Sequence, residues 1–237
     1  MQFSPDVLDA VHEHAGEVAP MEACGLVVDD GNGQVYLRCA NLAEEPGIFI
    51  LSPDDFAAAE DCHNVVGVAH SHYAAPPGPS QADLVGCESS GLPWLIVNYP
   101  VGDYHVIHPS GYVAPLKGRQ FHHGVFDCYS IVRDYYRLEL GIELKDYHRD
   151  VEWWLNGGDL YMQHFADAGF VMVPIESLRK HDVVLMKCRS TVINHAAVYI
   201  GDTRIIQHLV GRISGEDTYD GYWRKVTVAA IRHRDLT

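Results

Sequence analysis

Two histidines, a serine and an aspartate lie close together in the first half of the chain, at a spacing that suits metal binding. His70 and His72 follow an apolar run, residues 65–69, that predicts a buried strand, and residues two apart on a strand point to the same face. Ser80 and Asp83 follow a proline-rich loop, which predicts a stiff connection into a helix. Two imidazoles and a carboxylate form a three-ligand set for zinc, with the fourth position left to water. We therefore expect a catalytic metal site here.

These residues also have a simpler interpretation. Ser80 and Asp83 are close to a capping-box pattern, which by itself marks only the start of a helix. A histidine pair on one strand is, on its own, more often structural than ligating. A strand, a stiff loop and a helix start in this order favour the metal site. Such a site needs a general base, and Glu22, just before the first predicted strand, is the candidate.

A second group of reactive residue types lies in the other half of the chain. Asp127 can cap a helix whose first residue is Cys128, and the free N–H groups and dipole of a helix N-terminus favour a thiolate. The commoner fate of a single cysteine is burial as an inert side chain. His195 and His208 occur on two predicted strands joined by a tight turn at residues 201–202, so their rings can lie side by side.

A cysteine at a helix start, a histidine on a strand and a polar residue on the neighbouring strand form the arrangement of a cysteine-peptidase triad. In this interpretation Cys128 is the nucleophile, His195 is the general base and His208 orients His195. The pairing should lower the pKa of the thiol and make Cys128 the most reactive of the six cysteines.

Helices and strands are mixed along both halves of the chain, which predicts an α+β protein of two domains. We expect the domains at residues 1–108 and 124–237, joined by a turn-rich linker at 109–123. The predicted helices begin at residues 4, 52, 80 and 128, and the predicted strands are 24–28, 34–39, 65–69 extended through the histidine pair, 94–99, 104–107, 182–186, 194–201 and 204–209.

Composition limits the classes of function. The chain has 237 residues, of which 47% are hydrophobic, as in globular proteins, and its net charge is −15. That charge argues against nucleic acid and against an anionic membrane surface as partners. The six cysteines are scattered, which favours reduced thiols. Neither a signal peptide nor an apolar run of membrane-spanning length is recognised, so we expect synthesis in a cytoplasm and no membrane anchor.

The first group of residues resembles the motif of the JAMM metallopeptidases, over about residues 1–108. The positions that carry the resemblance are the segment 20–26, Glu22, His70, His72, Ser80 and Asp83. The resemblance implies a zinc ion held by the two histidines and the aspartate, with the glutamate as general base and the serine stabilising a tetrahedral oxyanion. Many members have proline directly after the second histidine, where this chain has Tyr73.

The second half resembles the NlpC-type cysteine peptidases, which have a papain-like fold, over about residues 120–233. Residues 124–129 match the nucleophile segment, residues 195–201 match the strand of the general base, and His208 matches the third polar residue. Many cell-wall enzymes of this family carry Asp-Cys-Ser-Gly-Leu, whereas this chain has Asp-Cys-Tyr-Ser-Ile. The resemblance implies cleavage of peptide bonds in peptidoglycan stem peptides.

The order of the two halves is similar to that in tail assembly proteins of lambda-like phages. It implies a tail-tip component with peptidase activity, present in the host cytoplasm during assembly and then in the virion tail tip. The implied partners are other tail-tip proteins and a peptidoglycan peptide. One alternative is a structural tail-tip protein whose sites are unused. Another is a cellular isopeptidase acting on a ubiquitin-like protein, against which the NlpC-type half argues.

Overall fold

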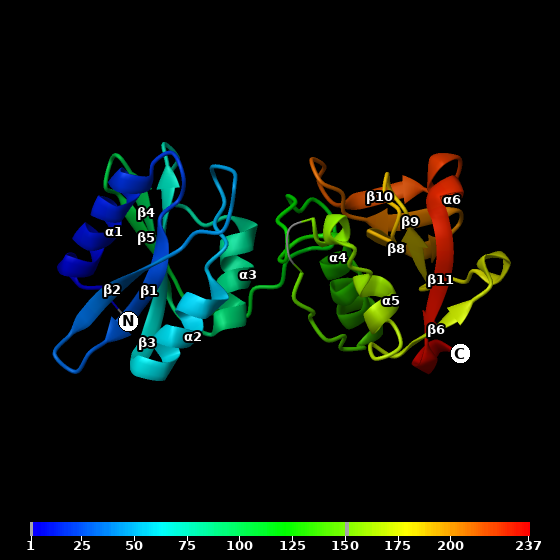
Figure 1. Ribbon diagram of the computed structural model, residues 1–237, viewed down its shortest axis with the longest axis horizontal. Coiled ribbons are helices and arrows are strands. Elements are labelled where there is room, and N and C mark those ends of the chain that lie inside the picture. Colours follow the sequence, from blue (N-terminus) through cyan, green and yellow to red (C-terminus); the bar gives the residue numbers. More distant parts are fainter. Residues whose placement is uncertain (1, 150–151) are drawn as a thin grey trace. The chain divides into compact units, whose positions relative to one another are not determined.

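The computed structural model describes residues 2–149 and 152–237, and the chain divides into two compact units between Val113 and Ala114 (Figure 1). Each unit contains one sheet together with helices, so the predicted mixture of helices and sheets in two domains is confirmed.

The first unit is a five-stranded sheet in the order β2-β1-β3-β4-β5, in which only the β3–β4 pair is parallel. Its elements are α1 (Pro5–Val18), β1 (Cys24–Asp29), β2 (Gln34–Cys39), α2 (Pro53–Cys62), β3 (Asn64–Tyr73), α3 (Gln81–Ser90), β4 (Trp94–Tyr99) and β5 (Tyr104–Ile107).

Both faces of this sheet are covered, because its central strands are apolar on both sides. Val7 and Val11 of α1 pack with Ala69 and other residues of one face. Ala59 of α2 and Cys87 of α3 pack into the cluster on the opposite face. The strands β1, β3 and β4 therefore have a fixed register, and the residues at their ends have defined positions.

The second unit is a six-stranded antiparallel sheet in the order β10-β9-β8-β7-β11-β6. Its elements are α4 (Cys128–Tyr135), the π-helix Tyr136–Leu140, the 3-10 helix Trp153–Asn156, α5 (Leu160–His164), β6 (Phe170–Val173), the 3-10 helix Ile175–Ser177, β7 (Val183–Met186), β8 (His195–Gly201), β9 (Arg204–Gln207), β10 (Gly215–Thr218), α6 (Tyr222–Val226), β11 (Thr227–His233) and the 3-10 helix Arg234–Leu236.

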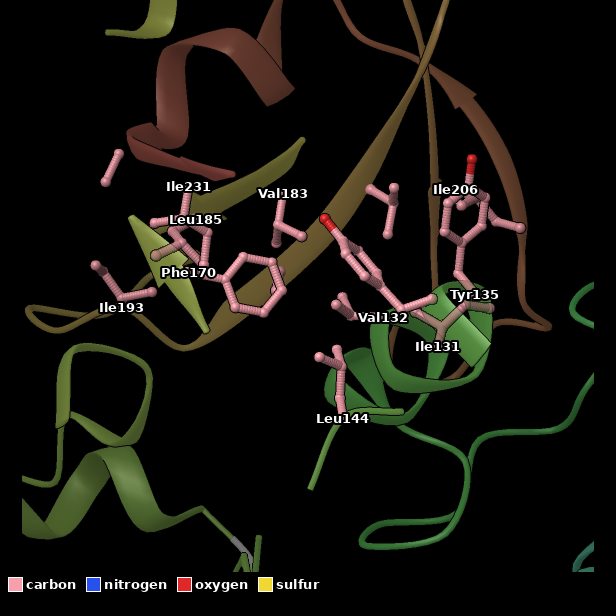
Figure 2. Packing of buried hydrophobic residues seen from close by; sticks show 14 residues of the cluster. Ile131, Val132, Tyr135, Leu144, Phe170, Val183, Leu185, Ile193, Ile206 and Ile231 are labelled. Atoms are coloured by element: carbon pink, nitrogen blue, oxygen red, sulfur yellow. The ribbon is translucent and has the colours of Figure 1, made fainter. Parts of the chain in front are cut away.

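The core of this unit forms where α4 packs on the sheet (Figure 2). Ile131, Val132 and Tyr135 project from one side of α4 and join Val183 and Ile206 from the strands. Since this face of α4 is buried, the first residue of the helix is held at the end of the sheet where β8 begins. The fold thereby fixes the position of Cys128.

The start of the second unit is anchored by a buried arginine. Arg119 is fully buried and forms an ion pair with Asp134, with 2.5 Å between Nη1 and Oδ2. Its guanidinium also donates to the carbonyl oxygens of Ala114 and Pro115. These contacts place residues 114–119, which the sequence analysis assigns to the linker, within the packed second unit.

In the described part of the chain, none of the helices combines the length and the apolar character that crossing a bilayer requires.

Candidate active sites

The predicted metal ligands converge in the first unit. The Nε2 atoms of His70 and His72 are 3.2 Å apart, and Asp83 places one carboxylate oxygen 3.3 Å from the first and the other 3.5 Å from the second. Zinc ligands with bonds of about 2.0–2.1 Å in a tetrahedron lie about 3.3 Å apart. The three side chains therefore have the spacing that a zinc ion needs.

The base candidate is placed by the pairing of β1 with β3. Cys24 lies opposite His70, and extending this antiparallel register places Glu22 opposite His72. Residues opposite each other in a sheet share a face, so Glu22 is on the ligand side. Glu22 is buried, and burial raises the pKa of its carboxyl group, while both histidines act in the opposite direction. A carboxylate with a raised pKa suits a general base.

Two polar side chains hold the segment that carries Glu22. Ser71, between the two histidines, accepts a hydrogen bond from the Ala23 N–H at 2.9 Å, and its own N–H donates to the Ala23 carbonyl. Asn41 donates from Nδ2 to the Glu22 carbonyl at 2.9 Å. The base is thus tied directly to the strand that carries the two ligands.

Local hydrogen bonds orient the ligands. His72 Nδ1 lies 2.9 Å from the Pro76 carbonyl, so Nδ1 carries the proton and Nε2 is left free to bind a metal. Ser80 and Asp83 form a complete capping box: Ser80 Oγ accepts from the Asp83 N–H, and Asp83 Oδ2 accepts from the Ser80 N–H. The helix-cap interpretation and the ligand interpretation are therefore compatible.

Electrostatics at this cluster favour an ionised carboxylate. Burial alone would raise the pKa of Asp83, but hydrogen bonds from His70, His72 and the Ser80 N–H hold it well below its usual range. Burial lowers the pKa of His72, and its hydrogen bonds to Asp83 and Pro76 reverse this, so that the pKa is raised overall.

Two aromatic rings that the sequence analysis did not single out support His70. Phe49 stacks on the imidazole with 4.5 Å between ring centroids, and Trp94 meets it edge-on at 5.7 Å. Phe49 comes from the segment between β2 and α2, which has no motif. His70 Nδ1 has no hydrogen-bond partner among the described residues, so packing rather than hydrogen bonding fixes this ring.

In the second unit, Cys128 is the first residue of α4, as predicted. Asp127 caps the helix by accepting from the N–H groups of Tyr129 and Ser130. The Cys128 thiol lies 3.2 Å from the Tyr161 hydroxyl and 3.9 Å from the Asn194 carbonyl, which directly precedes His195. Tyr161 was not recognised in the sequence, because it is on the short helix α5 without a motif around it.

His195 is oriented by Gln207 rather than by His208. The His195 Nε2 atom is 2.8 Å from Gln207 Oε1, and Gln207 Nε2 donates to Asp217 at 2.7 Å. Since the amide must donate to the carboxylate, its oxygen accepts from His195, which leaves Nδ1 as the basic nitrogen. The sequence prediction that His208 is the third member of the triad is wrong.

Strand geometry explains this correction. The pairing of β8 with β9 places Val198 opposite Ile206, so even-numbered residues share one face and odd-numbered residues the other. His195 and Gln207 are on the same face, whereas His208 follows β9 with the other parity. His208 is buried, contacts Phe121 edge-on, and has no hydrogen-bonded ring nitrogen among the described residues.

Burial shifts the pKa values of the thiol and the imidazole in the directions that favour their neutral forms. Burial raises the pKa of Cys128 to about 11, and Asp127 adds to the shift, while the Tyr161 hydroxyl and the Ala196 backbone oppose it. Burial lowers the pKa of His195 to about 4, with Gln207 acting against it. The expected lowering of the thiol pKa is therefore wrong, because desolvation outweighs the helix terminus.

Cys128 and His195 line one cavity of about 550 Å³. Aromatic side chains contribute much of its wall, including Trp153, Tyr161 and Trp223. A cavity of this volume with a mainly apolar wall and a few polar groups is typical of a site for a small organic ligand or a short peptide.

Comparison with known proteins assigns both halves to families. Residues 4–107 match the model for prokaryotic homologs of the JAB domain, and residues 118–232 match the NlpC/P60 family. The first unit is thus JAB-like and the second is NlpC/P60-like.

Two relatives match most of this chain, and a third matches part of it. The tail tip assembly protein K of Escherichia phage N15 is 38% identical over 232 residues, which are 97% of this chain and 95% of that protein. The protein of the same name from Escherichia phage lambda is 38% identical over 184 residues, 78% of this chain and 89% of that protein. The desampylase of Pyrococcus furiosus is 34% identical over 84 residues, 33% of this chain and 60% of that protein. The chain belongs to the family of tail tip assembly protein K.

Proposed function

We propose that this protein is a phage tail-tip assembly component that hydrolyses peptide bonds, with Cys128 cleaving peptidoglycan stem peptides. The observation that carries the proposal is the placement of Cys128 and the oriented His195 on one cavity. Sequence identity to two tail tip assembly proteins supports the role in the tail and implies other tail proteins as partners.

The directions of the two pKa shifts favour one order of proton transfers. Nδ1 of His195 accepts the thiol proton as Cys128 attacks the substrate carbonyl, and later returns it to the leaving amine. Gln207 stabilises the resulting imidazolium by accepting from Nε2–H. Burial raises the pKa of the Tyr161 phenol well above its usual value, so its hydroxyl stays protonated and can donate to the oxyanion.

We further propose that the first unit is a zinc peptidase site. The observed spacing of His70, His72 and Asp83 suits zinc, and Lewis-acid activation of water is the chemistry that zinc supplies in such a site. Glu22 would take the proton of the attacking water and pass it to the leaving amine. Ser80 would donate its hydroxyl proton to the oxyanion while its oxygen still caps α3.

Digestion of purified peptidoglycan stem peptides, followed by mass spectrometry, tests the cysteine activity. Wild type should release fragments, and Cys128→Ala should lower the rate by about 10⁴-fold or more. The matched control is Cys62→Ala, which removes an exposed thiol of the first unit and should leave the rate unchanged. Fragment release by Cys128→Ala at the wild-type rate would refute the assignment of the nucleophile.

A structural role in the tail is the second candidate, and the names of the two relatives favour it. Complementation of a phage that lacks this gene separates the two roles. Particles assembled with Cys128→Ala and His70→Ala would show that assembly does not need either site. Failure of both variants to assemble, with normal folding, would show that the sites act during assembly.

A further inference from the structure

The charged side chains around the cysteine cavity are almost all neutralised by one another. Arg149 pairs with Asp127 at 2.7 Å and with Asp146 at 2.8 Å. Arg212 pairs with Asp217 at 3.3 Å. Arg189 also lines this cavity, and within residues 2–149 and 152–237 it has neither an ion pair nor a side-chain hydrogen bond.

The loop that carries Arg189 is attached to the catalytic residues. The Asn194 side chain accepts from the Cys188 N–H at 2.8 Å and donates to the Cys188 carbonyl at 3.1 Å, which closes the loop between them. The Asn194 carbonyl contacts the Cys128 thiol, and His195 is the next residue. Asn194 therefore links the loop of Arg189 both to the nucleophile, which its carbonyl contacts, and to the base, which it directly precedes.

Arg189 is presented outward by this loop rather than folded into it. Its backbone has φ of 53°, in the left-handed region that residues other than glycine seldom adopt. Its side chain is exposed, and Tyr222 lines the same cavity. Burial raises the pKa of the Tyr222 phenol, and the positive charge of Arg189 acts in the opposite direction. An unpaired guanidinium over an aromatic cavity is suited to a planar anion.

We propose that Arg189 binds a carboxylate group of the substrate, so that the cysteine site selects peptides with a free carboxylate close to the scissile bond. This inference rests on the proposed peptidase function of Cys128. The guanidinium binds a carboxylate through two parallel hydrogen bonds, which fixes the orientation of the peptide as well as its charge. The aromatic walls accept the uncharged remainder of the peptide.

The first test does not depend on peptidase activity. Cys128 is alkylated with iodoacetate, which carries a carboxylate, and separately with iodoacetamide, which is neutral. The ratio of the two rates cancels any change in the thiolate fraction. Arg189→Ala should lower this ratio by roughly fivefold, a size expected for one exposed charge, and Arg189→Lys should restore most of it. Added salt should lower the ratio in wild type but not in Arg189→Ala.

Lys187→Ala is the matched control, because Lys187 is an exposed cation two residues away that does not line the cavity. It should leave the ratio unchanged. If the rate ratio fell equally in Arg189→Ala and Lys187→Ala, general surface charge would explain the effect. The assignment of Arg189 as the carboxylate-binding residue would then be overturned. An unchanged ratio in Arg189→Ala, with circular dichroism like that of wild type, would overturn it as well.

The second test uses two peptides that differ only in a free carboxylate or a carboxamide next to the cleaved bond. Arg189→Ala should raise KM for the carboxylate peptide about tenfold, with kcat nearly unchanged, and leave the carboxamide peptide unaffected. Equal effects on both peptides would refute carboxylate binding. If wild type cleaves neither peptide, the peptidase proposal fails, while the alkylation ratio still decides whether Arg189 attracts a carboxylate.

Discussion

In the first unit, the base candidate and two ligands lie on or beside the paired strands β1 and β3, and the third ligand is in the first turn of α3. In the second unit, the thiol, the imidazole and the amide come from α4, β8 and β9, and segments without regular structure form part of the cavity wall. The first site is a consequence of strand register and one capped helix. The second also depends on how loops pack around it.

The units also differ in charge. Residues 1–113 contain sixteen acidic residues and one basic residue, Arg38, whereas residues 114–237 contain sixteen of each. The net charge of −15 therefore belongs entirely to the first unit. Among the described residues that line the cysteine cavity of the second unit, Arg189 carries a positive charge without an ion-pair partner.

Removal of a metal ligand should give the largest effect and affect one site alone. Wild type should bind one zinc per chain, and His70→Ala should weaken binding by at least about 100-fold, since it leaves only two protein ligands. Competition with a chromogenic chelator measures this. Glu22→Gln should keep the metal, and His63→Ala, an exposed histidine of the same unit, is the control. Slower alkylation of Cys128 in His70→Ala would show that the sites are not independent.

Substitution of Gln207, the third member of the triad in the structure, should give the next largest effect, a loss of kcat. Gln207→Ala should lower kcat on a stem peptide by roughly 10- to 100-fold, because the His195 imidazole loses the acceptor that fixes its tautomer. His208→Ala should change kcat less than about threefold, since among the described residues no hydrogen bond joins His208 to His195. Steady-state kinetics over a range of pH measures both variants. A larger loss for His208→Ala would restore the triad expected from the sequence.

The pH dependence of Cys128 alkylation should give a smaller effect. It distinguishes a neutral thiol beside a neutral imidazole from a thiolate–imidazolium pair. With the Cys128 pKa raised to about 11 by burial, its thiolate fraction should increase about tenfold from pH 8 to pH 9 and continue to rise above that. In urea-unfolded protein the increase should flatten above the ordinary cysteine pKa of about 8.5. Iodoacetamide rates with peptide mapping measure it. A plateau between pH 5 and pH 8 would indicate a thiolate–imidazolium pair instead.

Division of the chain should give the smallest effect. We propose that residues 1–113 and 114–237 fold separately. A fragment that begins at residue 118 lacks the carbonyl groups of Ala114 and Pro115, to which Arg119 donates. It should be less stable than a fragment that begins at 114 by about 1 kcal/mol, as expected for lost hydrogen bonds. Urea unfolding of both fragments measures the difference. An insoluble 114–237 fragment would contradict separate folding.

Much of the first site could be predicted because its positions follow from local rules. His70 and His72 share a face by strand periodicity, and Ser80 with Asp83 forms a cap by sequence spacing alone. Phe49 could not be predicted, because its contact with His70 depends on the path of an irregular segment. The same holds for Tyr161, which reaches Cys128 from a short helix 33 residues further along the chain.

The error over His208 has a different cause. The turn at 201–202 and the parity of the two strands place Gln207 beside His195, whereas the expectation for His208 rests on its residue type and not on the face that it occupies. The strands β6, β10 and β11 were not predicted at all. The pairing of β11 with β6 and β7 brings distant segments together, whereas β10 pairs with the neighbouring strand β9 but is short and polar.

Asp83 accepts the Ser80 N–H at the start of α3 and also belongs to the metal cluster. Fraying of this first helical turn would carry the carboxylate away from the two histidines, which stay on β3. Occupancy of the cluster and amide hydrogen exchange in the first turn of α3 are therefore thermodynamically linked. A ligand bound by Asp83 slows exchange there, and a change that loosens the cap lowers affinity by the same free energy.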